Sequence, residues 1–210
     1  MKLLSSPLLI LLLVTISLFF VTCTNKLPLD PNESFNKNPT HSWHSQEWSD
    51  YTKSLVDAKF STLDNASDVK QLCKSYNALT KDQKLNMWVE LFSAIAKFES
   101  SYDPKAEGVD VGTKENKDTW SVGLLQLSVV DQVNLGLPMG LKYEDLKDPK
   151  NNLKLGVSIM SNQIQKRKKV LIPKGEKGVV SVYWAVINPG NKNDKSKEIL
   201  EMTNKSEGCL

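Results

Sequence analysis

A helical pattern of large apolar side chains begins near residue 80 and constrains the fold of this 210-residue chain more than any other feature. The segment "TKDQ" at 80–83 has the form of a capping box, in which the Thr80 hydroxyl accepts from first-turn amides and Gln83 reaches back. The apolar positions that follow, at steps of three, four and three, are Leu85, Trp88, Phe92 and Ile95. This spacing predicts a helix that starts after Thr80 and buries one face.

Glu99 occupies the next position of the same stripe, four residues after Ile95. A carboxylate on a buried helix face is costly when it is ionised and unpaired, so the group should be neutral, paired or placed at a cleft. Desolvation raises the pKa of a carboxyl, and a glutamic acid with a pKa of roughly 6 can donate a proton to a leaving oxygen at neutral pH. The periodicity leaves a simpler alternative open, in which the helix frays before Glu99 and the side chain reaches water.

Several other stretches show helical patterns. Residues 45–60 and 66–79 carry aromatic and aliphatic side chains near helical spacing, so each is predicted as a helix. Asp148 and Pro149 suit the N-cap and first residue of a further helix. The apolar stripe of that helix is Leu153, Val157, Met160 and Ile164.

The sequence pattern of the C-terminal part is less decisive about secondary structure. Residues 178–190 are strongly apolar and end at an Asn-Pro-Gly stop, a pattern that favours neither strand nor helix. Residues 193–204 predict a final short helix. Together the patterns predict one mainly α-helical domain over residues 46–210, with little or no β structure.

The N-terminus carries an export signal. A short basic start is followed by an apolar run that ends at Cys23, which resembles a bacterial lipoprotein signal over residues 1–22, although Phe, Val and Thr precede the cysteine. Residues 24–40 are rich in Pro and Asn, so 23–45 is interpreted as a flexible tether. We expect lipid attachment at Cys23 and a location in the bacterial cell envelope; cleavage without lipid and retention as an anchor are the alternatives.

The composition narrows the choice of partners. The chain has 27 Lys+Arg against 24 Asp+Glu, a near balance that argues against a dedicated nucleic-acid binder. His41 and His44 form an H-x-x-H pattern without an accompanying Cys or acidic cluster, so we predict no metal and no cofactor. With Cys23 taken by lipid, Cys73 and Cys209 are candidates for a disulfide in an oxidising compartment; the alternative is two unrelated thiols.

Two segments together carry a family resemblance. "ESSYDPKA" at 99–106 resembles the Glu-Ser-x-aromatic-x-Pro-x-Ala signature of the lytic transglycosylase domain, a family related to goose-type lysozyme. "GLLQ" at 123–126 resembles its Gly-Leu-Met-Gln signature, with Leu in place of Met. "DPKNNLKLG" at 148–156 also matches a helix start of the family. The third signature, Ala-Tyr-Asn-Ala-Gly, survives only as "VYWAV", which keeps Tyr183 and Ala185.

The resemblance covers about residues 80–190 and implies a lysozyme-like catalytic domain. It implies cleavage of peptidoglycan between N-acetylmuramic acid and N-acetylglucosamine, with Glu99 as general acid and then base. The muramyl 6-hydroxyl then closes on the anomeric carbon to give a 1,6-anhydro end. Ser100 and Gln126 match residues that line the sugar cleft, and Tyr183 matches a tyrosine whose hydroxyl approaches the catalytic carboxylate. Gly123, which has no side chain, would let the backbone approach the substrate closely. We expect the protein to be a monomer.

Two alternatives stay open. A hydrolytic lysozyme of the same fold needs a second carboxylate to hold water, and Asp110, Glu115 and Asp118 lie in a charged loop that can supply one; a solvated charged loop is the simpler interpretation. The altered third signature also allows a peptidoglycan-binding lipoprotein without turnover. Retention of Glu99 on an apolar stripe argues against that, because binding needs no acid there.

Overall fold

The computed structural model describes residues 41–109, 115–137, 139–175 and 183–209, all of which belong to a compact unit that spans Asn38–Leu210. The predicted signal peptide, Cys23 and the first part of the predicted tether lie outside the described residues. Within the described ranges, no helix is both long enough and apolar enough to cross a bilayer.

The described residues are mainly helical, as predicted. The α-helices are α1 (Gln46–Ala58), α2 (Phe60–Leu63), α3 (Val69–Leu72), α4 (Lys81–Ser100), α5 (Val129–Asn134), α6 (Pro149–Arg167) and α7 (Ser196–Thr203). The short 3₁₀-helices are η1 (Tyr76–Ala78), η2 (Lys117–Thr119), η3 (Glu144–Lys147) and η4 (Ala185–Ile187). The strands β1 (Glu107–Gly108) and β2 (Ser121–Val122) form one small antiparallel pair.

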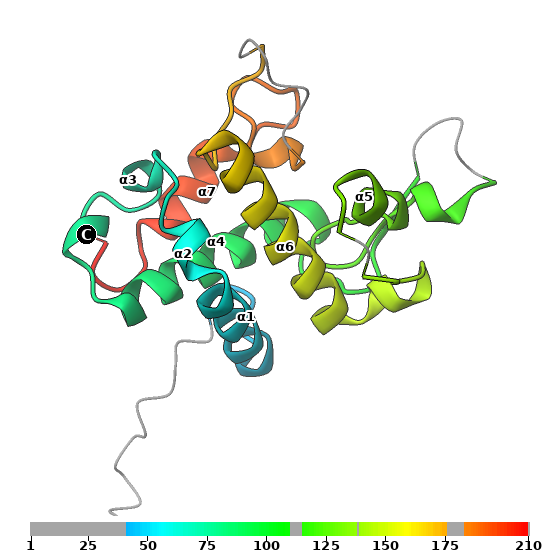
Figure 1. Ribbon diagram of the computed structural model, residues 1–210, viewed down its shortest axis with the longest axis horizontal. Helices are drawn as coiled ribbons and strands as arrows, with labels where there is room; N and C mark the ends of the chain where they lie inside the picture. Colours follow the sequence, from blue (N-terminus) through cyan, green and yellow to red (C-terminus); the bar gives the residue numbers. More distant parts are fainter. Residues whose placement is uncertain (1–40, 110–114, 138, 176–182, 210) are drawn as a thin grey trace, which may run out of the picture. The chain divides into compact units, whose positions relative to one another are not determined.

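Helix α4 runs through the middle of the folded unit, between α1 and α7 (Figure 1). It begins where the capping box predicts: the Gln83 N–H donates to Thr80 Oγ1 at 3.3 Å, and the Thr80 N–H donates to Gln83 Oε1 at 3.0 Å. Thirteen of its twenty residues are buried, which include the whole predicted stripe of Leu85, Trp88, Phe92 and Ile95. The helix is therefore packed on more of its surface than the one face that the stripe predicts.

The prediction of one helix over residues 66–79 is wrong. This stretch forms only the four-residue α3 and, after a break, the single turn η1. Cys73 at the break has extended backbone with φ −153° and forms a disulfide, while the buried Asp68 carboxylate accepts the Val170 N–H at 3.0 Å. Contacts with distant parts of the chain therefore override a local helical pattern, although its apolar members Val69, Leu72 and Tyr76 are buried.

The other helix predictions are confirmed. Helix α1 lies within 45–60 and α7 lies within 193–204. Helix α6 begins at Pro149 and is capped by Asp148, whose Oδ1 accepts the Asn151 N–H at 3.0 Å. Its predicted stripe of Leu153, Val157, Met160 and Ile164 is buried. In the undecided segment 178–190, residues 178–182 lie outside the described residues and Ala185–Ile187 form η4.

A disulfide joins Cys73, which follows α3, to Cys209 near the C-terminus, with 4.9 Å between the two Cα atoms. The sequence separation of 136 residues makes this a long closed loop, and such a cross-link limits the freedom of the unfolded chain. Next to it, Gly208 lies so close to α4 and the residues before it that an added Cβ would stand 2.8 Å from a Leu79 methyl group. The tail is therefore fixed over the start of α4.

The last residues of the predicted tether, 41–45, lie against α4. A His41 ring nitrogen is 3.1 Å from the Asn86 carbonyl oxygen, and the Ser42 N–H donates to Glu90 at 3.1 Å. The folded part of the chain thus includes residues before position 46, where the sequence places the start of the domain.

Residues 101–109, 115–137 and 139–148 gather beside the C-terminal end of α4 (Figure 1). This segment contains the β1–β2 pair, α5 and η3, and it connects α4 to α6. It holds both family-like signature segments that follow Glu99, so the arrangement of these short elements determines the surroundings of that residue.

Candidate active site

Glu99 lies in the last turn of α4, directly before a sharp change in chain direction. Ser101 and Tyr102 both have left-handed backbone, with φ of 54° and 68°, which is uncommon for residues that carry a side chain. Their N–H groups donate to the Lys97 carbonyl at 3.1 Å and to the Ala96 carbonyl at 3.4 Å, so the helix end is closed by backbone bonds. Consecutive strained residues are typical of functional sites, where the surrounding structure holds them in place.

The Glu99 side chain is half-buried, and no hydrogen bond joins it to any residue in the described part of the chain. Burial raises its pKa from 4.5 to about 7, because the desolvated carboxylate has lost water without gaining a donor. A substantial fraction of the group therefore holds its proton at neutral pH. Such a carboxyl can donate a proton and later take one back.

Ser100, predicted to line the sugar cleft, is buried and bonded within the protein. Its hydroxyl lies 2.9 Å from the Leu124 carbonyl oxygen and 3.1 Å from the Ala96 carbonyl oxygen. It thereby links the helix that carries Glu99 to the second signature segment. A contact between Ser100 and sugar stays a prediction.

The two signature segments are joined at the Ala106 carbonyl. This oxygen accepts the Gly123 N–H at 2.9 Å and the side-chain amide of Gln126 at 3.1 Å. The same amide also bonds to the Gly123 carbonyl at 3.0 Å, and Gln126 has a left-handed φ of 48°. Gln126 is therefore held at a fixed place beside the turn that follows Glu99.

Gly123 has a φ of 76° and no space for a side chain. A Cβ at this position would stand 2.5 Å from the Asn152 amide nitrogen and 2.5 Å from the Leu146 carbonyl oxygen. The sequence suggests that this glycine lets substrate approach the backbone; the structure shows instead a close approach by the protein's own groups. Its part in substrate binding stays a prediction.

Asn152 on α6 forms hydrogen bonds with the backbone of the second signature segment and its neighbours. It is fully buried, its Oδ1 accepts the Leu125 N–H at 2.9 Å, and its Nδ2 donates to the carbonyls of Val122 at 2.8 Å and Leu146 at 2.9 Å. One side chain thus satisfies three buried backbone groups, which fixes residues 122–125 relative to α6.

The Tyr183 hydroxyl donates to Asp131 Oδ2 at 2.6 Å, whereas the resemblance implies an approach to Glu99. Burial is the main cause of a raised pKa at Tyr183, followed by the nearby Asp131 carboxylate, and the charge of Glu99 adds to it. The charges of Asp131 and Glu99 thus both affect the pKa of Tyr183, and the Tyr183 hydroxyl donates its hydrogen bond to Asp131.

Trp184 stands where the family signature has Asn. It is buried, its indole N–H donates to the Leu125 carbonyl at 2.9 Å, and its ring packs edge-on against Phe92 with 6.4 Å between centroids. The altered third signature therefore contacts the second one through the indole N–H of Trp184.

The acidic loop supplies no buried carboxylate in the described residues. Glu115 and Asp118 are both exposed, and Asp110 lies outside the described residues. Glu115 and Asp118 are thus exposed, as the interpretation of a solvated charged loop expects.

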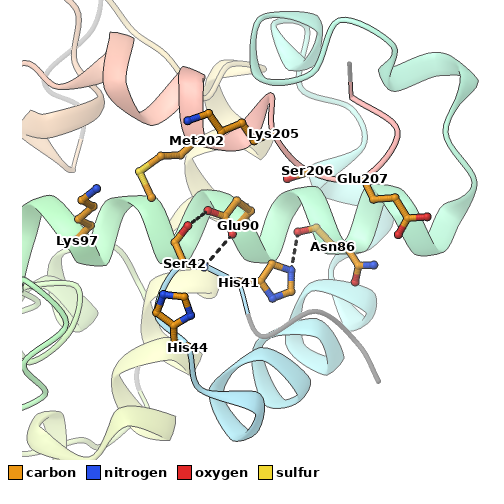
Figure 2. Close-up of a pocket in the computed structure, with 10 residues that line it drawn as sticks. All are labelled: His41, Ser42, His44, Asn86, Glu90, Lys97, Met202, Lys205, Ser206 and Glu207. Carbon is orange, nitrogen blue, oxygen red and sulfur yellow. Dashed lines mark hydrogen bonds between the residues drawn. The ribbon is translucent and has the colours of Figure 1, made fainter. Parts of the chain in front are cut away.

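A second buried glutamate, Glu90, lies on another face of α4. Together with His41, His44, Lys97 and residues of the C-terminal segment it lines a pocket of about 440 Å³ (Figure 2). Both Ser42 donors, the N–H and the hydroxyl, point to its carboxylate. His41 also lies 3.0 Å from the Ser49 hydroxyl, so this histidine belongs to the packing of the N-terminal segment. Within the described residues, no group of three or more His, Cys, Asp or Glu side chains is placed to hold a metal.

Two relevant residues are missed by the sequence patterns. Asp131 belongs to a capping box with Ser128 at the start of α5, and the spacing Ser-x-x-Asp is a signal for it, but nothing local indicates its bond to Tyr183. Glu90 lies off the apolar stripe, so only its contact with the N-terminal segment reveals that it is buried.

The domain is mainly helical, and its central helix ends with a carboxyl that two signature segments frame. These features place the domain in the lysozyme-like class. The chain matches the transglycosylase SLT domain over residues 68–197, more than half of its length, and therefore belongs to that family. Membership of this family implies an enzyme of the glycosidase type that acts on peptidoglycan.

Solved structures support the fold. The chain is similar to the wild-type form 2 structure of Bd0314 DslA, with 23% identity and a TM-score of 0.66, over 79% of this chain and 92% of that one. Two glutamate-to-glutamine variants of DslA match with the same identity and coverage and a TM-score of 0.65. No match was found among curated proteins.

Proposed function

We propose that this protein is a lytic transglycosylase that cleaves peptidoglycan between N-acetylmuramic acid and N-acetylglucosamine. Family membership supports the polymer and the class of reaction. The observation that carries the proposal is Glu99, a half-buried carboxyl without a described hydrogen-bond donor, whose pKa burial raises to about 7.

In the first step the neutral Glu99 carboxyl gives its proton to the glycosidic oxygen. The bond between that oxygen and the muramyl anomeric carbon breaks, and positive charge develops on the sugar ring. The acetamido oxygen of the substrate can share this charge. The raised pKa of Glu99 serves this step, because a carboxyl with an ordinary pKa holds almost no proton at neutral pH.

In the second step the Glu99 carboxylate takes the proton of the muramyl 6-hydroxyl. The freed oxygen bonds to the anomeric carbon, which gives a 1,6-anhydro end and restores the acid without consuming water. The route needs one carboxyl only. The exposure of Glu115 and Asp118 supports it, since neither is buried beside the helix end, and the Asp131 carboxylate already accepts from Tyr183 and Ser128.

The proposal includes a location in the bacterial cell envelope, where peptidoglycan is found. The apolar segment that ends at Cys23 supports export and attachment to a membrane through lipid. The disulfide between Cys73 and Cys209 suits an oxidising compartment. The protein is proposed to act as a monomer, without a cofactor.

Mass spectrometry of products from purified peptidoglycan sacculi tests the reaction type. We expect anhydro-muropeptides from the wild type and none from Glu99→Gln. Reducing muropeptides from the wild type would show a hydrolytic lysozyme instead. Binding to sacculi without any product, on acetylated and deacetylated glycan alike, would show a binding protein and overturn the proposal.

A further inference from the structure

A pocket of about 440 Å³ lies along the face of α4 that carries Glu90 (Figure 2). Helix α4 forms its floor, the N-terminal segment 41–44 forms one wall, and residues 202–207 of the C-terminal segment form the other. Its volume falls in the range of about 300–1,000 Å³ that is usual for ligand sites. None of its described lining residues belongs to the two signature segments, so the pocket is separate from the surroundings of Glu99.

The floor presents its polar groups in one row. Asn86, Glu90 and Lys97 follow one another on α4 at steps of four and seven residues, which is the spacing of a single helix face. From Asn86 to Lys97 the row extends over about 16 Å, at 1.5 Å per residue. The Glu90 carboxylate, between them, already accepts both donors of Ser42 and so fixes the N-terminal wall against the helix. The groups at the two ends remain for a ligand.

The Asn86 end lacks a hydrogen-bond donor. Asn86 is only 5% exposed, yet its side-chain oxygen has no partner in the described part of the chain, and neither has the buried Ser206 hydroxyl. Buried polar groups in proteins are nearly always bonded, so these two atoms indicate a missing partner. The exposed Glu207 carboxylate is at the same end, because Gly208 after it lies against Gln83 in the first turn of α4. An acceptor amide and a carboxylate together suit an ammonium group.

The Lys97 end has the opposite charge. Lys97 is exposed, and its ammonium lies 5.6 Å from the centre of the Phe98 ring. Lys205 adds a second ammonium on the C-terminal wall, and no ion pair within the described ranges includes either lysine. His44 and the apolar side chain of Met202 also line the pocket. The Lys97 end therefore suits a carboxylate group.

We propose that this pocket binds a short extended peptide, whose ammonium group meets Asn86 and Glu207 and whose carboxylate meets Lys97. Four extended residues span about 13–14 Å, which fits the row on α4 once the long lysine side chain bends toward the ligand. Two sources share this chemistry, namely the peptide stems of peptidoglycan and free peptides. The first source rests on the proposed action on peptidoglycan, and the binding itself does not.

Backbone-amide NMR of the purified full chain tests the site with tetra-alanine, a four-residue peptide that carries both terminal charges. We expect saturable shifts at residues 41–44, 86–97 and 202–207, and none at 123–126. N-acetyl-tetra-alanine lacks the ammonium, and tetra-alanine amide lacks the carboxylate. Each blocked peptide should bind at least about fivefold more weakly than tetra-alanine, because one end of the pocket then meets no opposite charge.

Two exposed residues give matched variants with little risk to the fold. Lys97→Gln should weaken the binding of tetra-alanine by about threefold and leave that of the amide form unchanged, because this form has no carboxylate. Glu207→Gln should weaken tetra-alanine by a similar factor and leave the N-acetyl form unchanged. Lys192→Gln, at an exposed position outside the pocket, is the control for net charge and should change none of the affinities.

The absence of saturable shifts, equal binding of the free and blocked peptides, or shifts confined to residues outside the pocket would overturn the proposal. A stem peptide purified from sacculi is titrated in the same way. Tighter binding of the stem than of tetra-alanine assigns the site to the peptides of the polymer, and equal or weaker binding assigns it to free peptides. The titration needs no turnover, so its failure and the failure of the proposed reaction are distinguishable.

Discussion

Helix α4 carries two glutamates with opposite surroundings. Glu90 is only 7% exposed, but its carboxylate accepts from the Ser42 N–H at 3.1 Å and from the Ser42 hydroxyl, and His44 and Lys97 are near. Glu99 is less buried and has no described hydrogen bond. Burial raises the pKa of both groups, and at Glu90 the Ser42 donors, followed by His44 and Lys97, oppose the rise.

The difference teaches that hydrogen-bond donors, more than burial, distinguish the carboxylate of Glu90 from the carboxyl of Glu99, for which a catalytic role is proposed. The two residues are nine positions apart, or 2.5 helical turns, so they face opposite sides of the same helix. One side meets the N-terminal segment, which supplies donors to Glu90 (Figure 2). On the other side, the Glu99 carboxyl receives no hydrogen bond from any residue in the described part of the chain.

The largest expected effect comes from the same substitution at both positions. Glu99→Gln should reduce the rate of sacculus cleavage by about 10²- to 10⁴-fold, because glutamine cannot donate and regain a proton. Glu90→Gln should keep the rate within about threefold, since the glutamine oxygen can still accept from Ser42. Dye release from labelled sacculi measures both rates, and equal losses would contradict the distinction between the two glutamates.

A smaller effect is expected at the support of the second signature segment. Asn152→Ala removes hydrogen bonds to three buried backbone groups, of which the Val122 carbonyl keeps a bond from the Leu127 N–H at 3.0 Å, and it should lower the free energy of unfolding by about 2–4 kcal/mol. The matched control is Asn151→Ala, which removes one side-chain bond of 3.2 Å, to the Asp145 carbonyl. Urea denaturation compares them; equal losses would show that Asn152 is no more important than its neighbour.

Stability should also depend on pH through Glu99. Its pKa rises from 4.5 in the unfolded chain to about 7 in the fold, so the folded state binds the proton more tightly and wild-type stability falls as pH rises from 4.5 to 7. Glu99→Gln removes this loss and should be more stable than the wild type by about 1–3 kcal/mol at pH 8 and equal to it near pH 4. A difference that is constant with pH would contradict the assigned pKa.

The smallest expected effect tests the donors of Glu90. Ser42→Ala removes the hydroxyl that bonds to the buried carboxylate and should lower the free energy of unfolding by about 1 kcal/mol, with cleavage unchanged. Ser54→Ala, which removes an exposed hydroxyl bond to the Tyr51 carbonyl, should change it by less than about 0.5 kcal/mol. Thermal melts measure both, and a loss of cleavage in Ser42→Ala would link the N-terminal segment to the reaction.

The main helices could be predicted because their signals are local. The bonds between Thr80 and Gln83 fix the start of α4. Asp148, which accepts the Lys150 and Asn151 N–H groups, and the Pro149 that follows it fix the start of α6. The stripe of α4 also carries the prediction that Glu99 is partly buried, because a helix that continues in register places its carboxyl on the covered side.

The rest depends on contacts between distant residues. The bond from Tyr183 to Asp131 spans 52 positions, and that from Trp184 to the Leu125 carbonyl spans 59. No periodicity indicates such pairs, and Cys73, at which the helix breaks, forms a disulfide with Cys209, 136 positions away. The sequence therefore indicates which residues frame Glu99 without indicating which of them bond to one another.

The pH dependence of kcat/KM for sacculus cleavage tests the central claim most directly. If an acidic Glu99 drives the first step, the rate should be constant below neutral pH and fall about tenfold per unit above a pKa of about 7. A rate that already falls near pH 4.5, or that does not fall up to pH 9, would contradict the claim that burial keeps Glu99 protonated for catalysis.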